Sequence, residues 1–181
     1  MDIAATGPLD EIVAAALPLR AASTPAERQL AVYLLGFTCG RRPANLALLR
    51  EQAATDPSWE VQEAIAQAFD AFCAAIEYEA ALPTIDAWLA DDHPQVRRAV
   101  SEGLRPWTSK RRKYFAAHPA EAVRRLAALR ADPSDSTRHS AGNALRDVRR
   151  AWPALVDAET ATWDLADPRE AFTYRRVLQE R

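Results

Sequence analysis

One pattern recurs along the chain at nearly constant intervals, and it constrains the fold more than any other feature. Three segments share it: Asp56-Pro-Ser-Trp-Glu-Val61, Asp92-His-Pro-Gln-Val96 and Asp132-Pro-Ser-Asp-Ser-Thr137. Aligned on Val61, Val96 and Thr137, they lie 35 and 41 residues apart, and a fainter copy at 26–35 precedes them. Repeats of this length are typical of proteins built from one stacked supersecondary unit. The sequence therefore predicts at least four such units.

The stretches between these segments have the features of helices. Each begins near a proline, which the first turn of a helix accommodates because that N–H has no partner there: Pro43, Pro83, Pro119 and Pro153. Apolar residues follow at helical spacing, and Asp or Ser stands where it can cap the next helix. We therefore expect an all-α, HEAT-like solenoid of stacked antiparallel helix pairs in a right-handed superhelix, with the second helix of each pair lining a concave surface.

Length and composition bound the remaining possibilities. The 181 residues suit one domain, 1–181, and 49% hydrophobic residues with only five glycines exclude a disordered chain. No apolar run is long enough to cross a membrane, and the first residues lack the pattern of a secretory signal, so we expect a cytoplasmic protein. The two cysteines and three histidines are not spaced as metal ligands. We expect no metal, no cofactor and no membrane partner.

Charge is distributed unevenly along the chain. Residues 97–150 hold 14 Arg or Lys against five acids, a local net charge of +9, while the remainder carries −11. A basic segment in an otherwise acidic chain favours a polyanionic partner, and double-stranded DNA is the one we expect. Ten basic residues are candidates for phosphate contacts: Arg97, Arg98, Arg105, Lys110, Arg111, Arg112, Lys113, Arg138, Arg146 and Arg149.

Two alternatives to DNA contact stay open. Arginine makes up 21 of the 23 basic residues, which indicates a general compositional preference. Arginines of one repeat also often pair with aspartates of the next in helical solenoids. A separate alternative function is a non-enzymatic HEAT module that binds a protein partner, with the acidic amino-terminal half and the basic second half as complementary docking surfaces.

Three further strings carry a resemblance to a known family: Val96-Arg-Arg-Ala-Val-Ser-Glu-Gly-Leu-Arg-Pro-Trp107, Ser140-Ala-Gly-Asn-Ala-Leu-Arg-Asp-Val148 and Trp152-Pro-Ala-Leu-Val156. Over residues 56–156 the chain resembles the DNA alkylation repair family, the HEAT-like-repeat alkylpurine DNA glycosylases and their close relatives. The resemblance implies DNA binding and, in the enzymes, excision of cationic N3- or N7-alkylated purines without metal or cofactor. Some relatives keep the fold and bind DNA without excising bases.

The resemblance also implies which residues act. Such glycosylases carry a tryptophan and a carboxylate in the place of Trp88 and Asp92, and Trp107 is a second candidate platform. An indole can hold a cationic base, and a carboxylate can stabilise the positive charge that develops on the sugar. The structural alternative makes Trp88 a core residue and Asp92 a helix cap. Trp163 and Asp167 share the same spacing, but they follow the last repeat, and we interpret them as the end of a carboxy-terminal helix.

Overall fold

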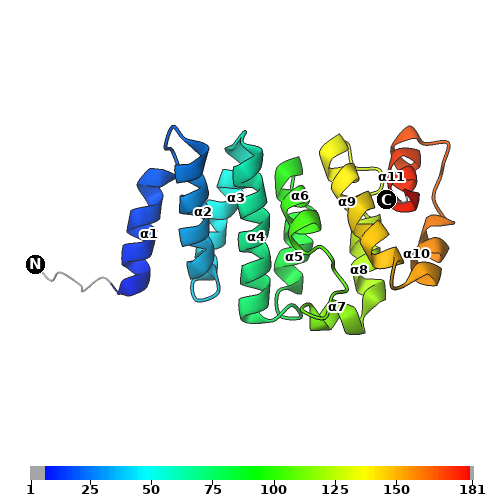
Figure 1. Cartoon of the computed structure of the whole chain (residues 1–181), viewed down its shortest axis with the longest axis horizontal. Coiled ribbons are helices and arrows are strands. Elements are labelled where there is room, and N and C mark those ends of the chain that lie inside the picture. The colour runs from blue at the N-terminus through cyan, green and yellow to red at the C-terminus, as the bar shows by residue number, and fades with distance from the viewer. Residues whose placement is uncertain (1–6, 180–181) are drawn as a thin grey trace, which may run out of the picture. The chain divides into compact units, whose positions relative to one another are not determined.

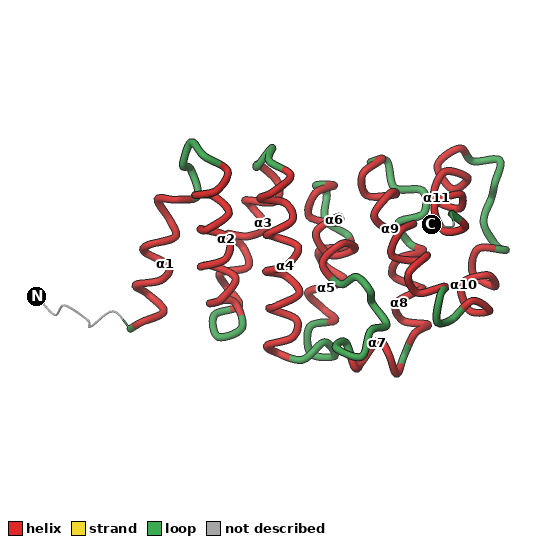
Figure 2. Tube along the Cα trace, viewed as in Figure 1, coloured by secondary structure: helices red, strands yellow, loops and turns green. Residues whose placement is uncertain are grey.

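The computed structural model describes residues 7–179, and all of its regular elements are helices (Figure 2). The chain divides into two compact units, residues 1–76 and 77–181, which we describe separately. The single domain expected from the sequence stays a prediction, and so does the handedness of the superhelix. No helix within residues 7–179 is long and apolar enough to span a membrane.

The first unit consists of two helix pairs (Figure 1). Helix α1 (Pro8–Leu19) packs on α2 (Pro25–Cys39), and a short 3-10 helix, η1 (Pro43–Asn45), leads into α3 (Leu46–Thr55), which pairs with α4 (Trp59–Ile76). Helices α2 and α4 also pack on each other. They approach so closely that a Cβ added at Gly36 would lie 2.7 Å from the Cβ of Ala68. Glycine is therefore required at this contact.

The second unit contains three helix pairs. They are α5 (Leu82–Leu89) with α6 (Pro94–Gly103), α8 (Pro119–Ala127) with α9 (Asp135–Arg149), and α10 (Pro153–Thr160) with α11 (Pro168–Leu178). A short helix, α7 (Lys113–Ala117), lies between α6 and α8. Helix α9 packs on both α6 and α11, so these three form one layer, and α8 and α10 contact α9 from the other layer (Figure 1).

The second helices of the pairs, α2, α4, α6, α9 and α11, are called B helices below, and the first helices are called A helices. Val61, Val96 and Thr137 are each the third residue of a B helix, which confirms the alignment made from sequence. The helix pairs confirm the predicted all-α repeat architecture. Helix α11 is one B helix more than the repeat pattern identified.

The fourth residue of four B helices has a common structural task. Arg28, Gln62, Arg97 and Arg138 each donate from the side chain to a carbonyl of the loop that precedes their own helix. Two of them also reach the neighbouring repeat of the same unit. The Nε and Nη2 atoms of Arg28 lie 2.7 and 3.2 Å from the Asp56 carboxylate, and those of Arg97 lie 2.6 and 2.8 Å from the Asp132 carboxylate. The arginine–aspartate pairing considered from sequence therefore exists.

Candidate nucleic-acid interface

The B helices of the second unit present arginines on their outer surface. Helical spacing of three, four or seven residues places them on one side of each helix. We call this surface the arginine face and define it by Arg98, Glu102 and Arg105 of α6 and its following loop, His139, Asn143, Arg146, Asp147 and Arg150 of α9, and Phe172, Arg175 and Arg176 of α11. All of these side chains are exposed or half-buried.

The acids of this face offset only part of its positive charge. Glu102 and Asp147 are its two carboxylates, and both bind Arg105, at 2.6 and 2.8 Å. Asp147 also lies 3.4 Å from Arg150. Six arginines against two acids leave a strongly positive surface, which is the electrostatic requirement for binding a phosphate backbone.

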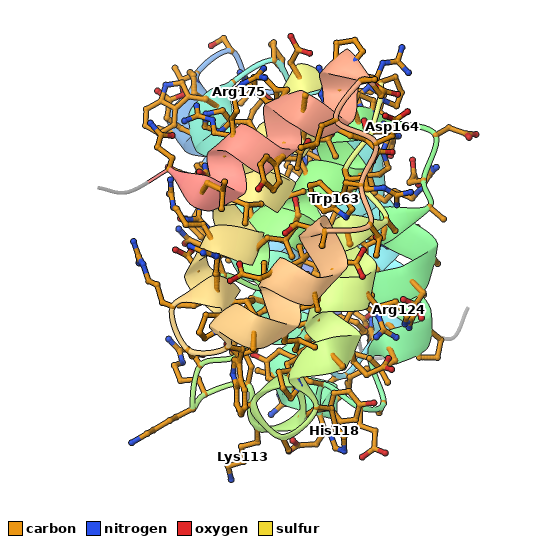
Figure 3. The ribbon with its side chains drawn as sticks, turned by 90° about the vertical axis from the view of Figure 1, so that its right-hand side faces the viewer. Lys113, His118, Arg124, Trp163, Asp164 and Arg175 are labelled. Carbon is orange, nitrogen blue, oxygen red and sulfur yellow. The ribbon has the colours of Figure 1, made fainter. Side chains whose placement is uncertain are left out.

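An end-on view shows where one arginine of this surface lies relative to an arginine of an A helix. In Figure 3, Arg175 of α11 lies on the side opposite Arg124 of the A helix α8. The Arg124 side chain is 62% exposed and pairs with Glu121 at 3.1 Å. Arg124, which this A helix exposes, is thus accompanied by an acid.

The loop after α6 holds a second group of cations. Lys110, Arg111 and Lys113, the first residue of α7, are exposed, and Lys113 extends away from the helices in Figure 3. Their contact with phosphates stays a prediction. Arg112 is different because it is buried and donates to the carbonyl of Gly103 at 3.0 Å. It holds the loop together and is unsuited to contact DNA, which corrects the prediction made for it.

Trp107 holds the same loop against the core. Its side chain has no solvent exposure, its ring centroid lies 4.9 Å from that of Phe115, and its Nε1–H donates to the carbonyl of Ser101. An indole without exposed surface cannot serve as a platform for a base. The structure therefore places Trp107 in the core and corrects its prediction as a catalytic residue.

Two more of the predicted phosphate contacts are engaged within the protein. Arg97 is bound to Asp132 in the bidentate pair described above, and Arg138 is buried against Asp135, with its guanidinium 5.4 Å from the Phe172 ring centroid. Both side chains are less than a tenth exposed, so they stabilise the repeats. They are unsuited to contact phosphates, which corrects the prediction made for them. Arg149 lies at the end of α9 and pairs with Asp157 at 2.6 Å.

The predicted pair Trp88 and Asp92 is separated by the end of a helix. Trp88 lies in the last turn of α5 and is 6% exposed, which favours a core role. Helix α5 ends at Leu89, so Asp92 does not continue the same helical face despite the spacing of four residues. Asp92 itself is exposed.

Asp92 does not cap α6, which corrects the structural alternative considered from the sequence. His93 caps α6 by accepting from the backbone N–H of Gln95, and Asp91 accepts from the N–H of His93 at 2.8 Å. In the neighbouring repeats, Asp56 and Asp132 take the place of Asp91, and Pro57 and Pro133 the place of Asp92. The Asp92 carboxylate makes no hydrogen bond or ion pair with the residues that the structure describes, and it is thus a carboxylate that the repeat does not require.

Trp163 and Asp167 have structural roles, although neither ends a helix. Both lie in the connection between α10 and α11, where Trp163 is 7% exposed and donates to Glu159 at 3.2 Å. The Asp167 carboxylate caps α11 by accepting from the N–H of Arg169. In Figure 3 the Trp163 side chain lies among the helices.

The sequence interpretation missed the contribution of α11. Arg175 and Arg176 of this helix, and His139 of α9 that contacts Arg176, belong to the arginine face. The signal was present, because Asp167-Pro168 repeats the Asp-Pro pairs at 56 and 132 that precede other B helices. Within residues 7–179 no group of three or more His, Cys, Asp or Glu side chains could hold a metal ion.

Comparison with known proteins places these features in a family. The model of HEAT repeats matches residues 13–105, whereas no curated protein matches the chain. The structure of smu.31 from Streptococcus mutans UA159 is 39% identical, covers 94% of this chain and 83% of its own, and superposes with a TM-score of 0.89. AlkD2 from Streptococcus mutans is also 39% identical, with coverage of 93% and 80% and a TM-score of 0.88.

A more distant structure shares the fold. It is the Pseudomonas fluorescens alkylpurine DNA glycosylase AlkC bound to DNA containing an abasic site analog, at 22% identity, a TM-score of 0.57 and coverage of 94% of this chain and 60% of that one. Repeat architecture, the HEAT match over half of the chain and the identity to AlkD2 agree with each other. The chain belongs to the DNA alkylation repair family of HEAT-repeat proteins.

Proposed function

We propose that this protein binds duplex DNA through its phosphate backbone, using the arginine face of the second unit. The observation that carries the proposal is the set of six arginines on and directly after three packed helices, against the two acids Glu102 and Asp147. A guanidinium holds a phosphate through two parallel N–H donors, and no base needs to be read for such binding. The protein then binds many sequences with similar affinity.

Salt dependence tests this proposal with the wild-type protein. Four or five phosphate contacts give a slope of log K against log salt of about −4, because each contact releases condensed counterions. Fluorescence anisotropy of a labelled duplex across a salt series measures this slope. A duplex of the same sequence with an uncharged methylphosphonate backbone is the control and should not bind. Equal binding of both duplexes would refute the proposal.

A second candidate function is excision of a cationic alkylated purine, and Asp92 is the specific observation in its favour. Its carboxylate is exposed and has no task in capping α6. In such a hydrolysis, the bond from C1′ to the purine nitrogen breaks, the cationic purine leaves as a neutral base with the bonding electrons, and water adds to C1′ and releases a proton to solvent. A carboxylate near the sugar stabilises the positive charge that develops there.

Release of 3- or 7-methylpurine from alkylated duplex DNA separates the two functions. If the protein excises, Asp92→Asn lowers the release rate on the order of 100-fold, as does loss of one electrostatic stabiliser in other enzymes, while DNA affinity stays within about twofold. Asp91→Asn is the matched control for the neighbouring carboxylate. Release that is unchanged by Asp92→Asn would exclude the role of Asp92, and no release with intact DNA affinity would leave DNA binding as the function.

A further inference from the structure

His139 lies at the junction of α9 and α11, in contact with an arginine. Its Nε2 meets Nη2 of Arg176, and its Nδ1 lies 3.1 Å from the side-chain amide of Asn143. A guanidinium only donates, so Nε2 must accept, and the proton of the neutral imidazole is then on Nδ1. Asn143 accepts a hydrogen bond from this Nδ1–H through Oδ1 when its amide is turned over. With the amide turned over, both contacts fit a neutral His139 that carries its proton on Nδ1.

The charges around His139 come from each B helix of the unit. Arg176 faces it from α11, Arg146 from α9, and Glu102 and Arg105 from α6 and its following loop. Burial lowers the pKa of His139, the arginines lower it further, and Glu102 alone opposes them. With no anion bound, the ring is neutral near pH 7 and accepts the hydrogen bond of Arg176.

A phosphate changes this balance. Its oxygens accept from the guanidinium of Arg176, which releases Nε2 of His139, and its negative charge offsets the arginines that held the ring neutral. We propose that His139, Arg146 and Arg176 form a subsite for one backbone phosphate, and that His139 takes up a proton from solvent as the phosphate binds. The new N–H bond forms at Nε2 and donates to a phosphate oxygen. This inference rests on the proposed binding of duplex DNA.

The subsite gives DNA binding a specific pH dependence. Binding raises the pKa of His139, so the association constant increases as pH falls, by up to about tenfold per pH unit between the pKa values of the bound and free protein. Below the pKa of the free protein the increase stops, because His139 is then protonated in both states. Phosphate contacts made only by arginine have no such dependence, since guanidinium does not titrate in this range.

Calorimetry of duplex DNA binding at pH 7, in two buffers of different ionisation enthalpy, counts the protons taken up. The wild-type protein should take up a substantial fraction of one proton, and His139→Gln close to none. His118→Gln is the matched control, because His118 is exposed, contacts the carbonyl of Tyr114, and lies near Lys113 in Figure 3. It should take up as many protons as wild type.

A titration of the imidazole C–H signals by NMR identifies the group directly. The pKa of His139 should lie below the usual value in the free protein and rise when the duplex binds. DNA binding with no proton uptake, or equal uptake by His139→Gln and wild type, would overturn the subsite alone. Failure of wild type to bind duplex DNA at all would overturn the proposed function and the subsite with it.

Discussion

The two units use the same helix-pair repeat but carry different side chains on their B helices. In the second unit, the outer positions of α6, α9 and α11 hold the arginine face. In the first unit, α2 exposes Leu30, Tyr33 and Phe37 at helical spacing, with exposed fractions of 49, 43 and 66%, and Trp59 at the start of α4 is 71% exposed. The repeat pattern determines which residues are buried, and it leaves the outer positions free to differ. The two units therefore differ in the faces that they expose, not in the repeat that builds them.

The largest expected effect concerns two tryptophans that differ in burial. Trp107→Ala should lower the free energy of unfolding by about 3 to 5 kcal/mol, because it empties a fully buried indole site. Trp59→Ala should stay within about 0.5 kcal/mol of wild type, because this side chain is 71% exposed. Urea denaturation followed by circular dichroism measures both. Similar losses of folding stability in the two variants would contradict the core position of Trp107.

Adjacent arginines of α6 should separate stability from binding. Arg97→Ala leaves Asp132 buried without its partner and should cost about 3 to 5 kcal/mol of folding stability. Arg98→Ala should cost less than about 1 kcal/mol and instead weaken DNA binding. Urea denaturation measures the folding stability of both variants, and the anisotropy titration measures their affinity for DNA. Reversed roles would show that the helix is rotated from its position in the structure.

The pair of Arg28 and Asp56 predicts an acid-dependent stability in the first unit. Burial raises the pKa of Asp56, but hydrogen bonds from Arg28, the Ser58 N–H and Gln52 outweigh it and leave the pKa below its ordinary value of 3.8. A lowered pKa in the folded state adds stability above pH 3.8, which is lost as pH falls through the folded value. Wild type should thus exceed Asp56→Asn in stability at pH 7, with a gap that narrows at low pH. A stability difference that does not change with pH would contradict the ion pair of Arg28 and Asp56.

The smallest effect is expected from the aromatic surface of the first unit. Phe37→Ser should change the affinity for duplex DNA less than about twofold, because phosphate binding depends on charge and this substitution changes none. Anisotropy at a single salt concentration suffices for this comparison. A tenfold loss would show that the first unit takes part in DNA binding.

The sequence predicted the fold because the signals for it are local. Pro119 and Pro153 each begin an A helix, and Val61, Val96 and Thr137 mark equivalent positions of B helices. These features depend on backbone geometry and spacing, which a single sequence displays. The extra B helix α11 was missed because the segment from Trp163 to Asp167 was interpreted as the end of a carboxy-terminal helix, followed only by a final turn.

The functional residues were harder to predict because accessibility depends on partners distant in sequence. Arg97 and Arg98 stand side by side in the sequence, and the partner that holds Arg97, Asp132, lies 35 residues later. Trp107 is buried because its loop folds back over Ser101 and Phe115. His139 acquires its surroundings from α11. Charge density located the basic segment, but the packing of the B helices selects which arginines face outward.

The most direct test of the arginine face compares two double variants with equal loss of charge. Arg146→Gln with Arg175→Gln removes two members of this face, whereas Arg50→Gln with Arg124→Gln removes two exposed arginines of the A helices α3 and α8. The first variant should bind duplex DNA on the order of tenfold more weakly, with a salt slope reduced by about 2, and the second should bind like wild type. Equal weakening by both variants would contradict the account, because it would mean that net charge alone, and not this face, binds DNA.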